Sequence, residues 1–541
     1  MKKIKCLCPA VEDILSLTLF LSMLVSNRIH GDEVSAQLFN QIYVIFTGYF
    51  LARLILGVNH KLVNPIITGI QLWAIFEAIK GILQIVGIIG SGNILFSCTG
   101  SFDNPGPYGG FLAVCTAISL PRLACKGQNS NGAAQISRIV TYTSVVLCCI
   151  VLPSTQSRAA LLAVAGGVLS CLSVNTKTRS FARRYWLLLA LCVIVLFTVV
   201  LAFKKQSASG RVFINKINLK TMVDNRMRGV GMGHFASAYG NAQTSYFKER
   251  IEFDNGNLVY YANDRERQVA DAPNAPFNEY FRIGIEFGLW PLLVFVLLCG
   301  VTLRNLWNNV PELLCGFVSI LLFMLFSYPL SKWQFLTVSV VCMACSAGRD
   351  NGMARSGITV VAGLLFLLLT VPELPRLRES RIDRAKWESQ RFLYEGKNFD
   401  NYEYCCSQLY ESQKCNCAFL YEYAYSLFMN GKLEESRIVA QQGLGVSCNP
   451  LLFILLGDLD KAQGKITQAE REYENAFYVL PDRLYPLSKL ATLYYENHDT
   501  ARFVNMVNSI RTFKPRVESA STKRIRFETD EMLWNSGFVP E

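Results

Sequence analysis

The chain has 541 residues, of which 51% are hydrophobic and 17% are charged, and its formal net charge is +12 at pH 7. Its apolar residues lie in long blocks rather than at amphipathic spacing, which excludes an ordinary soluble domain and is typical of a membrane protein. The positive charge does not indicate nucleic-acid binding, because many of the cations lie in short loops between the apolar blocks. We therefore expect membrane lipids among the partners and no nucleic acid.

Eleven apolar blocks predict transmembrane helices, because a helix needs about 20 apolar residues to cross about 30 Å of hydrocarbon. The basic N-terminus before the first block resembles a signal peptide, but further spans follow directly, so we expect the first helix to be retained. The expected spans are about 10–26, 36–57, 63–90, 108–121, 139–153, 159–174, 185–203, 285–303, 311–328, 333–347 and 357–372.

The cations of the short loops predict the orientation, because they gather on the cytoplasmic side of a membrane protein. With the N-terminus in the cytoplasm, the short outside loops hold only Arg28, Arg158 and Lys332. We therefore expect the loop 204–284, and everything after about residue 373, to lie outside the cytoplasm. The inside cations are Lys2, Lys3, Lys5, Arg53, Lys61, Arg122, Lys126, Arg138, Lys177, Arg179, Arg183, Arg184, Arg304, Arg349 and Arg355.

A recurring turn marks the C-terminal part of the chain. Gly396-Lys397, Gly431-Lys432, Gly464-Lys465 and His498-Asp499 follow one another at steps of 35, 33 and 34 residues. This period resembles tetratricopeptide repeats, whose helix pairs stack into a concave surface that binds a protein partner or an acceptor; a plain helical bundle is the alternative. The expected all-α chain thus has a membrane domain (1–372), a repeat domain (380–515) and a tail (516–541). Cysteines 405, 406, 415, 417 and 448 lie in this outside region, where pairing depends on an oxidising compartment.

Two short motifs lie at outside ends of expected spans. Thr99 to Gly110 holds two prolines and four glycines, and Asn104 within it can both donate and accept hydrogen bonds. Ser157-Arg158 precedes an apolar run, where a guanidinium group either reaches the interface or pairs with an anion such as phosphate. An ordinary turn and an interfacial arginine are the alternative interpretations.

The 204–284 loop carries two further motifs. Ser209-Gly210-Arg211 is followed by Arg228 and by the glycine run that contains Gly231 and precedes His234. No strand and no βαβ unit surround this run, so it is not a dinucleotide fingerprint. Farther along, Asn278 and Glu279 lead into the next span. Glu279, Arg282 and Glu286 share one helical face, where an Arg282–Glu286 ion pair is the purely structural interpretation.

In order, spacing and placement, these four motifs resemble the O-antigen ligase and polymerase superfamily, which includes bacterial protein O-oligosaccharyltransferases. The match spans roughly residues 95–300. The resemblance implies a multi-pass enzyme of the bacterial inner membrane. Such an enzyme joins a glycan from undecaprenyl diphosphate to a lipid A core or to a protein Ser/Thr on the periplasmic face, without a nucleotide sugar or an obligatory metal cofactor.

By this resemblance, Arg158 and Arg211 are expected to hold the diphosphate, with Arg228 a looser candidate and Asn104, Gly231 and Asn278 as supporting loop residues. Ligases of this group usually have a histidine just before the Asn of the last motif, where this chain has Phe277. The catalytic base is therefore open, with Glu279, His234 and Asp271 as candidates.

Other functions remain open at this point. Within the same class, the enzyme could polymerise repeat units. From other classes, the rivals are a transporter of lipid-linked glycans and a non-catalytic membrane scaffold. A transporter would favour ionisable residues at mid-membrane and duplicated halves, and only Glu77 and Lys80 lie well inside an expected span.

Overall fold

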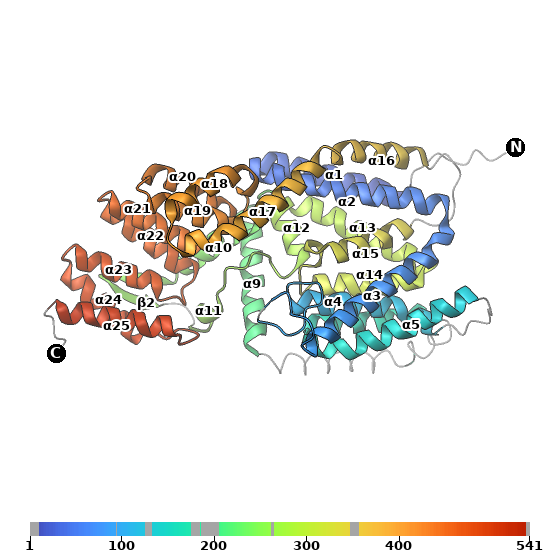
Figure 1. Cartoon of the computed structure of the whole chain (residues 1–541), viewed down its shortest axis with the longest axis horizontal. Helices are drawn as coiled ribbons and strands as arrows, with labels where there is room; N and C mark the ends of the chain where they lie inside the picture. Colours follow the sequence, from blue (N-terminus) through green and yellow to red (C-terminus); the bar gives the residue numbers. More distant parts are fainter. Residues whose placement is uncertain are drawn as a thin grey trace.

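The computed structural model describes residues 10–93, 95–124, 132–174, 184, 205–260, 264–346 and 356–536, and these residues are mostly helical. A group of long helices formed mainly by the first two thirds of the chain lies at one end, and the last helices lie at the other (Figure 1). The segment 205–287 connects the two groups (Figure 1). The span expected at 185–203 lies outside the described residues, as do the cations expected in the cytoplasmic loops at 2–5, 126, 177–183 and 349–355.

Each expected span within the described residues coincides with a helix. The third expected span ends early, because the helix stops at Ile85 and Gly87 has a left-handed φ of 82°. Short 3-10 turns at His60–Leu62, Leu152–Thr155 and Pro329–Ser331 connect some of these helices. The helices are α1 (Val11–His30), α2 (Glu33–Val58), α3 (Val63–Ile85), α4 (Pro105–Ala124), α5 (Gly132–Val151), α6 (Arg158–Val174), α13 (Leu289–Asn309), α14 (Pro311–Met324), α15 (Trp333–Ser346) and α16 (Ser356–Thr370).

By length and hydropathy, four segments of the described chain can cross a membrane: Glu33–Leu56, Val63–Ile85, Ala134–Thr155 and Leu289–Asn309. A fifth is added if α16 and the following helix, which bend by 41° at their junction, count as one span. Three shorter apolar helices, α6, α14 and α15, accompany them. The protein is therefore a multi-pass membrane protein, although fewer helices meet the full length criterion than the eleven spans expected.

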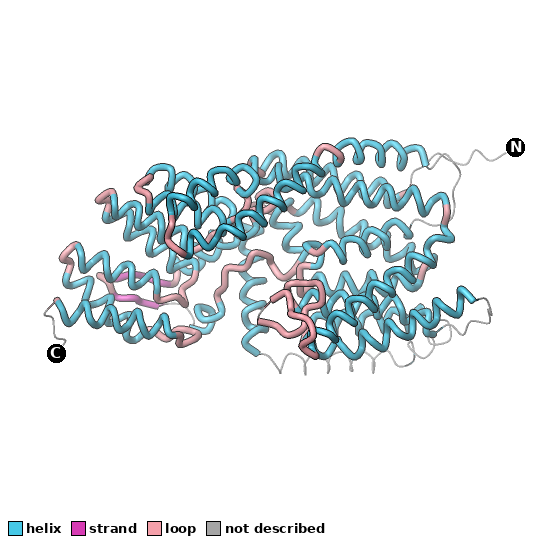
Figure 2. The backbone as a smooth tube through the Cα atoms, in the orientation of Figure 1, coloured by secondary structure: helices cyan, strands magenta, loops and turns pink. Residues whose placement is uncertain are grey.

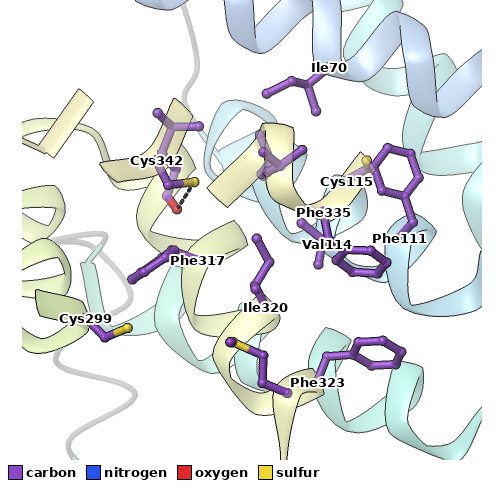
Figure 3. Close-up of a cluster of buried hydrophobic side chains, with 14 of the residues drawn as sticks. Ile70, Phe111, Val114, Cys115, Cys299, Phe317, Ile320, Phe323, Phe335 and Cys342 are labelled. Atoms are coloured by element: carbon purple, nitrogen blue, oxygen red, sulfur yellow. Dashed lines mark hydrogen bonds between the residues drawn. The ribbon is translucent and has the colours of Figure 1, made fainter. Parts of the chain in front are cut away.

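The core of the membrane part is formed by closely packed helices α4, α6 and α14. Small residues allow this close approach, as is common between helices in lipid: a Cβ on Gly167 or Gly316 would overlap Ala117 or Ile118 of α4. Aromatic rings fill the neighbouring space, where Phe323 and Phe335 stack at a centroid distance of 5.4 Å (Figure 3).

The connecting segment contains α9 (Lys205–Asp224), α10 (Phe235–Lys248), α11 (Asp264–Val269) and α12 (Glu279–Phe287), and also two strands, β1 (Ile251–Asp254) and β2 (Asn257–Tyr260). The strands pair antiparallel through a turn at Asn255-Gly256, where both residues have positive φ (Figure 2). The expectation of an all-α chain is therefore wrong at this hairpin. The Asn-Gly pair between β-forming residues is a strong hairpin signal, which the sequence analysis overlooked.

The C-terminal region consists of helix pairs joined by one repeated turn. Lys397, Gly431, Gly464 and His498 each have positive φ. At each turn, the N–H of the positive-φ residue donates to the carbonyl oxygen three residues earlier, and the N–H of the following residue donates to the carbonyl oxygen five residues earlier. These two hydrogen bonds end the preceding helix. The pairs are α17 (Glu373–Glu395) with α18 (Phe399–Gln413), α19 (Cys417–Met429) with α20 (Leu433–Val446), α21 (Pro450–Ala462) with α22 (Ile466–Val479), and α23 (Tyr485–Glu496) with α24 (Thr500–Thr512), followed by α25 (Ala520–Asn535). Cysteines 405, 406, 415, 417 and 448 are free thiols.

The connecting segment packs against the second helices of these pairs. Helix α10 contacts α20 and α22, and β2 contacts α24. One buried polar link is Arg267 of α11, which donates to the carbonyl oxygens of Pro481 at 3.3 Å and Lys514 at 2.7 Å. Its guanidinium also lies 4.5 Å from the Phe513 ring centroid. The segment and the C-terminal helices thus share one apolar core.

We expect Arg267→Ala to lower the free energy of unfolding by about 2–3 kcal/mol, because a buried and a partly buried carbonyl group lose a charged donor. The measurement is thermal unfolding of the purified protein in detergent, with limited proteolysis of the segment 205–287. Arg471→Ala, at an exposed arginine, is the matched control. Equal melting temperatures for the two variants would contradict this role.

Candidate functional site

Arg158 and Arg211, which lie 53 positions apart in the sequence, are brought into electrostatic reach of each other. Arg211 projects from α9, donates from Nη1 to the carbonyl oxygen of Phe326 at 3.2 Å, and lies 5.6 Å from the Phe277 ring centroid. Burial lowers the pKa of Arg211 from its ordinary value, and the nearby Arg158 charge lowers it further. Both effects disfavour the cation, and an anion that binds both guanidinium groups would oppose them.

Arg158 is placed by a tight turn at the start of α6. Gln156 adopts a left-handed φ of 47°, and the Ser157 hydroxyl accepts from the Ala160 N–H at 3.3 Å. The turn lies against the Asn104 loop: the Ser157 hydroxyl donates to Gly106 O at 3.4 Å, and a Cβ on Gly109 would lie 2.5 Å from the Thr155 hydroxyl. The first two sequence motifs are therefore neighbours in space.

The loop that contains Asn104 is anchored to α3 by two buried side chains. Gln84 accepts from the N–H groups of Thr99 at 2.9 Å and Gly100 at 2.7 Å. Glu77 accepts from the Ser101 N–H at 3.0 Å and also from the Ser101 hydroxyl. The Asn104 side chain accepts from the Gly106 N–H at 2.8 Å, so its oxygen supports the start of α4. Glu77, which sequence reasoning weighed as a transport residue, thus has a structural role in this loop.

The segment 325–332, between α14 and α15, links all of these groups, and sequence reasoning missed its role. The Phe326 carbonyl binds Arg211, the Tyr328 ring contacts Phe277 at a centroid distance of 5.7 Å, and Lys332 pairs with Asp103 of the Asn104 loop at 2.6 Å. The signal was the polar break Ser327-Tyr-Pro-Leu-Ser-Lys332 between two apolar helices. That break places the Tyr328 phenol near Arg211 and the Lys332 cation against the Asn104 loop.

Glu279 lies on the other side of this segment. Its side chain is only 1% exposed, accepts from the Leu330 N–H at 2.7 Å, and lies 3.8 Å from Arg282. Arg282 pairs with Glu286 at 3.4 Å, which confirms the expected ion pair, and also binds the Ser331 hydroxyl. Burial raises the pKa of Glu279 to about 7, against the opposing effects of Arg282 and the Leu330 N–H. This carboxyl group is therefore able to exchange a proton near neutral pH.

Next to this carboxyl group is an apolar cavity of about 180 Å³. Helices α1, α2, α13, α14 and α15 supply most of its walls, and Glu279, Arg282 and Glu286 form its polar part. An apolar cavity with a small charged region is the usual form of a site for an amphiphilic molecule.

The remaining predicted site residues have other surroundings. Asn278 caps α12 by accepting from Tyr280 and Phe281. Asp271 accepts from the Ala272 N–H at 2.9 Å. Gly231, with φ 91°, lies against Gly31 and Ser35. Arg228 is exposed and lines a separate groove.

His234, a candidate base, lies where the membrane helices meet the repeats. Its Nδ1 is 2.6 Å from the Gly445 carbonyl oxygen of α20, and its Nε2 is 2.9 Å from Asp32 of the α1–α2 turn. Segment 325–332 thus contacts Arg211, Phe277 and Glu279, and Arg158 lies within electrostatic range of Arg211, whereas His234, Asp271, Gly231 and Arg228 lie elsewhere. Within the described ranges, no group of three or more His, Cys, Asp or Glu could hold a metal ion.

Comparison with protein families gives a match for the central part of the chain. Residues 143–296 match the O-antigen ligase family. The matched region runs from α5 into α13, and it includes Arg158, Arg211, Phe277 and Glu279 but not the C-terminal helix pairs. A match to this family implies an enzyme of glycosyl transfer that acts on a lipid-linked glycan. Among curated proteins, no relative matches the chain.

We expect the stability of the wild-type protein to fall relative to Glu279→Gln as the pH rises from about 4.5 to about 7. The pKa of this carboxyl is higher in the folded protein, so the stabilising proton is present below pH 4.5 and is lost as the pH rises through 7. The difference should change by at most about 1.4 kcal/mol per pH unit.

The measurement is unfolding of both proteins in detergent across this pH range. Glu249→Gln, at an exposed carboxylate, is the control and should keep the wild-type pH dependence. Parallel curves for wild type and Glu279→Gln would show that Glu279 has no raised pKa.

Proposed function

We propose that this protein is an inner-membrane glycosyltransferase. It moves a glycan from undecaprenyl diphosphate to a lipid A core or a protein Ser/Thr on the periplasmic face. The observation that carries the proposal is the arginine pair, Arg158 with Arg211, inside the region that matches the O-antigen ligase family. Two guanidinium groups at a partly buried boundary suit a diphosphate, because each offers planar, paired donors to phosphate oxygens.

The proposed topology has eleven spans, a cytoplasmic N-terminus and a periplasmic repeat domain. Contacts at several helix ends support it. The connecting segment hydrogen-bonds Asn27 and Ser35 around the α1–α2 turn through Met232, and binds Phe326 after α14 through Arg211. The Asn104 loop before α4 pairs with Lys332, and the turn before α6 touches Gly106. Each of these turns contacts the connecting segment or another of the turns, which is consistent with the alternating spans of the proposed topology.

In the proposed reaction, an acceptor hydroxyl oxygen attacks the anomeric carbon of the first sugar. The bond between that carbon and the diphosphate oxygen breaks, and the electron pair goes to the diphosphate. Arg158 and Arg211 stabilise the charge that develops there, and they need little reorganisation because Arg211 is already bound to the Phe326 carbonyl. Attack from the face opposite the leaving group inverts the anomeric carbon.

The proposed base for the acceptor proton is Glu279. A pKa of about 7 lets this carboxyl group accept a proton near neutral pH. His234 contacts two acceptor oxygens at the repeat junction, and Asp271 accepts from the neighbouring backbone. Phe277, which stands where ligases of this group usually have histidine, contacts Arg211 through its ring. Glu279 thus takes over the proton transfer that Phe277 cannot perform.

The C-terminal helix pairs are proposed to form a tetratricopeptide-like domain that recruits a macromolecular acceptor. The four similar turns support this architecture. Their second helices are covered by the connecting segment, and this contact ties the domain to the proposed transfer site.

We expect Arg158→Ala and Arg211→Ala each to reduce glycan transfer by about 10²–10³-fold, as loss of one preorganised charge-stabilising donor does in other enzymes. The assay uses purified protein in nanodiscs, radiolabelled undecaprenyl-diphosphate oligosaccharide, and three acceptors: a lipid A core, a Ser/Thr-containing protein, and the donor itself. The acceptor that becomes labelled distinguishes lipid ligation, protein glycosylation and polymerisation.

The control is Arg226→Asn, which removes an exposed cation from the same loop and keeps a residue suited to its φ of 51°. Normal melting temperatures show that the variants are folded. Full transfer by both alanine variants would contradict the proposed site. If the wild-type protein transfers no glycan to any of the three acceptors, the proposed function is wrong.

A further inference from the structure

A second cationic group, Arg228, lies in a groove on the outer surface of the membrane helices. The groove has a volume of about 580 Å³ and runs between α1 and the start of α13. Its α1 wall is formed by Thr18, Leu21, Ser22 and Val25, which lie at helical steps of three and four and therefore share one face. The site is separate from the arginine pair, because Arg211 binds Phe326 and neither arginine of the pair lines this groove.

The groove is apolar along its length. Leu21 and Val25 are each 55% exposed, and Trp290 is 65% exposed. The three hydroxyl groups on the α1 wall already have acceptors, because Thr18 donates to Ile14 O, Ser22 donates to Leu19 O, and Ser26 donates to Arg228 O. A hydrocarbon chain therefore suits the groove better than a polar ligand does.

The groove becomes cationic at its outer end. Arg228 and His30 line it there, and no carboxylate does so within the described ranges. The Arg228 side chain forms no hydrogen bond or ion pair with any part of the chain that the structure describes. The Arg228 backbone packs against Gly288, directly before the first residue of the α13 span, so Arg228 lies at one end of that span. Trp290 beside it is of the residue type that favours this interface.

The backbone of Arg228 is held rigidly although its side chain is exposed. The Ser26 hydroxyl donates to the Arg228 carbonyl at 3.2 Å, and the Leu289 N–H donates to the Met227 carbonyl at 2.9 Å. Gly288, with φ 93°, allows this approach, because a Cβ there would lie 2.7 Å from the Arg228 carbonyl oxygen. An exposed cation on a fixed backbone, at the mouth of an apolar groove, has the form of a site built for an anion with a hydrocarbon tail.

We propose that this groove binds an anionic glycerophospholipid of the surrounding bilayer. The phosphate contacts Arg228, and one acyl chain lies along Leu21, Val25 and Trp290. A single arginine near a membrane surface favours an anionic over a zwitterionic lipid by about fivefold. Arg228 lies just after the last residue of α9, and Arg211 lies in the first half of the same helix. A lipid bound at Arg228 would therefore hold the C-terminal end of α9. The proposal does not depend on the transfer reaction.

The test uses Trp290 as the reporter, because bromine atoms on an acyl chain quench a tryptophan they touch. The full-length protein is placed in phosphatidylcholine nanodiscs with a small fraction of brominated phosphatidylglycerol or, separately, of brominated phosphatidylcholine. The difference between wild type and Trp290→Phe isolates the Trp290 signal. We expect about fivefold stronger binding of the brominated phosphatidylglycerol, as judged from titrations of this quenching.

Arg228→Gln should abolish the preference for phosphatidylglycerol, whereas Arg226→Asn, at an exposed arginine that does not line the groove, should preserve it. Melting temperatures show whether the variants remain folded. Equal quenching by the two lipids, no quenching of Trp290, or a preference that survives in Arg228→Gln would each overturn the proposal. None of these outcomes bears on glycan transfer, which is measured separately.

Discussion

The proximity of two like charges, Arg158 and Arg211, is the electrostatic constraint on which the arrangement of the candidate site depends. Two guanidinium groups repel each other, and burial of Arg211 adds a desolvation cost. The surrounding elements keep them in place through neutral contacts: the Phe326 carbonyl and the Phe277 ring on Arg211, and the capped turn before α6 below Arg158. A polyanion that contacts both groups would offset their repulsion, and this would favour its binding.

Three separate chain segments converge to hold this arrangement. The Asn104 loop is anchored by Glu77 and Gln84, the segment 325–332 pairs with it through Lys332, and α9 carries Arg211 toward both. Because these contacts cross between the helices of the membrane part, the geometry of the site depends on the packing of α4, α6 and α14 beneath it. Small residues at those helix contacts therefore contribute indirectly to the chemistry.

The connecting segment shares one apolar core with the C-terminal helix pairs, and it contacts the membrane helices separately. Arg267, the β1–β2 hairpin and α10 are held against the repeats, while Met232 and His234 contact the α1–α2 turn. The C-terminal helix pairs thus contact the same connecting segment that carries Arg211. An acceptor recruited by the repeats would be delivered close to the proposed donor, which suits a transfer reaction better than a freely tethered domain would.

The sequence by itself determined the membrane class, the helices, the match to a glycan-ligase family and the positions of the repeated turns. All of these depend on local hydropathy, on short motifs or on residues such as Gly431 that favour a left-handed turn. The hairpin at Asn255-Gly256 was equally local and was overlooked. Only the tertiary structure decided that Arg211 meets Arg158 while Arg228 does not, that Lys332 pairs with Asp103, and that His234 lies at the repeats. These relations join residues from distant segments, and they depend on how helices pack and loops fold back, which hydropathy and spacing along the chain do not encode.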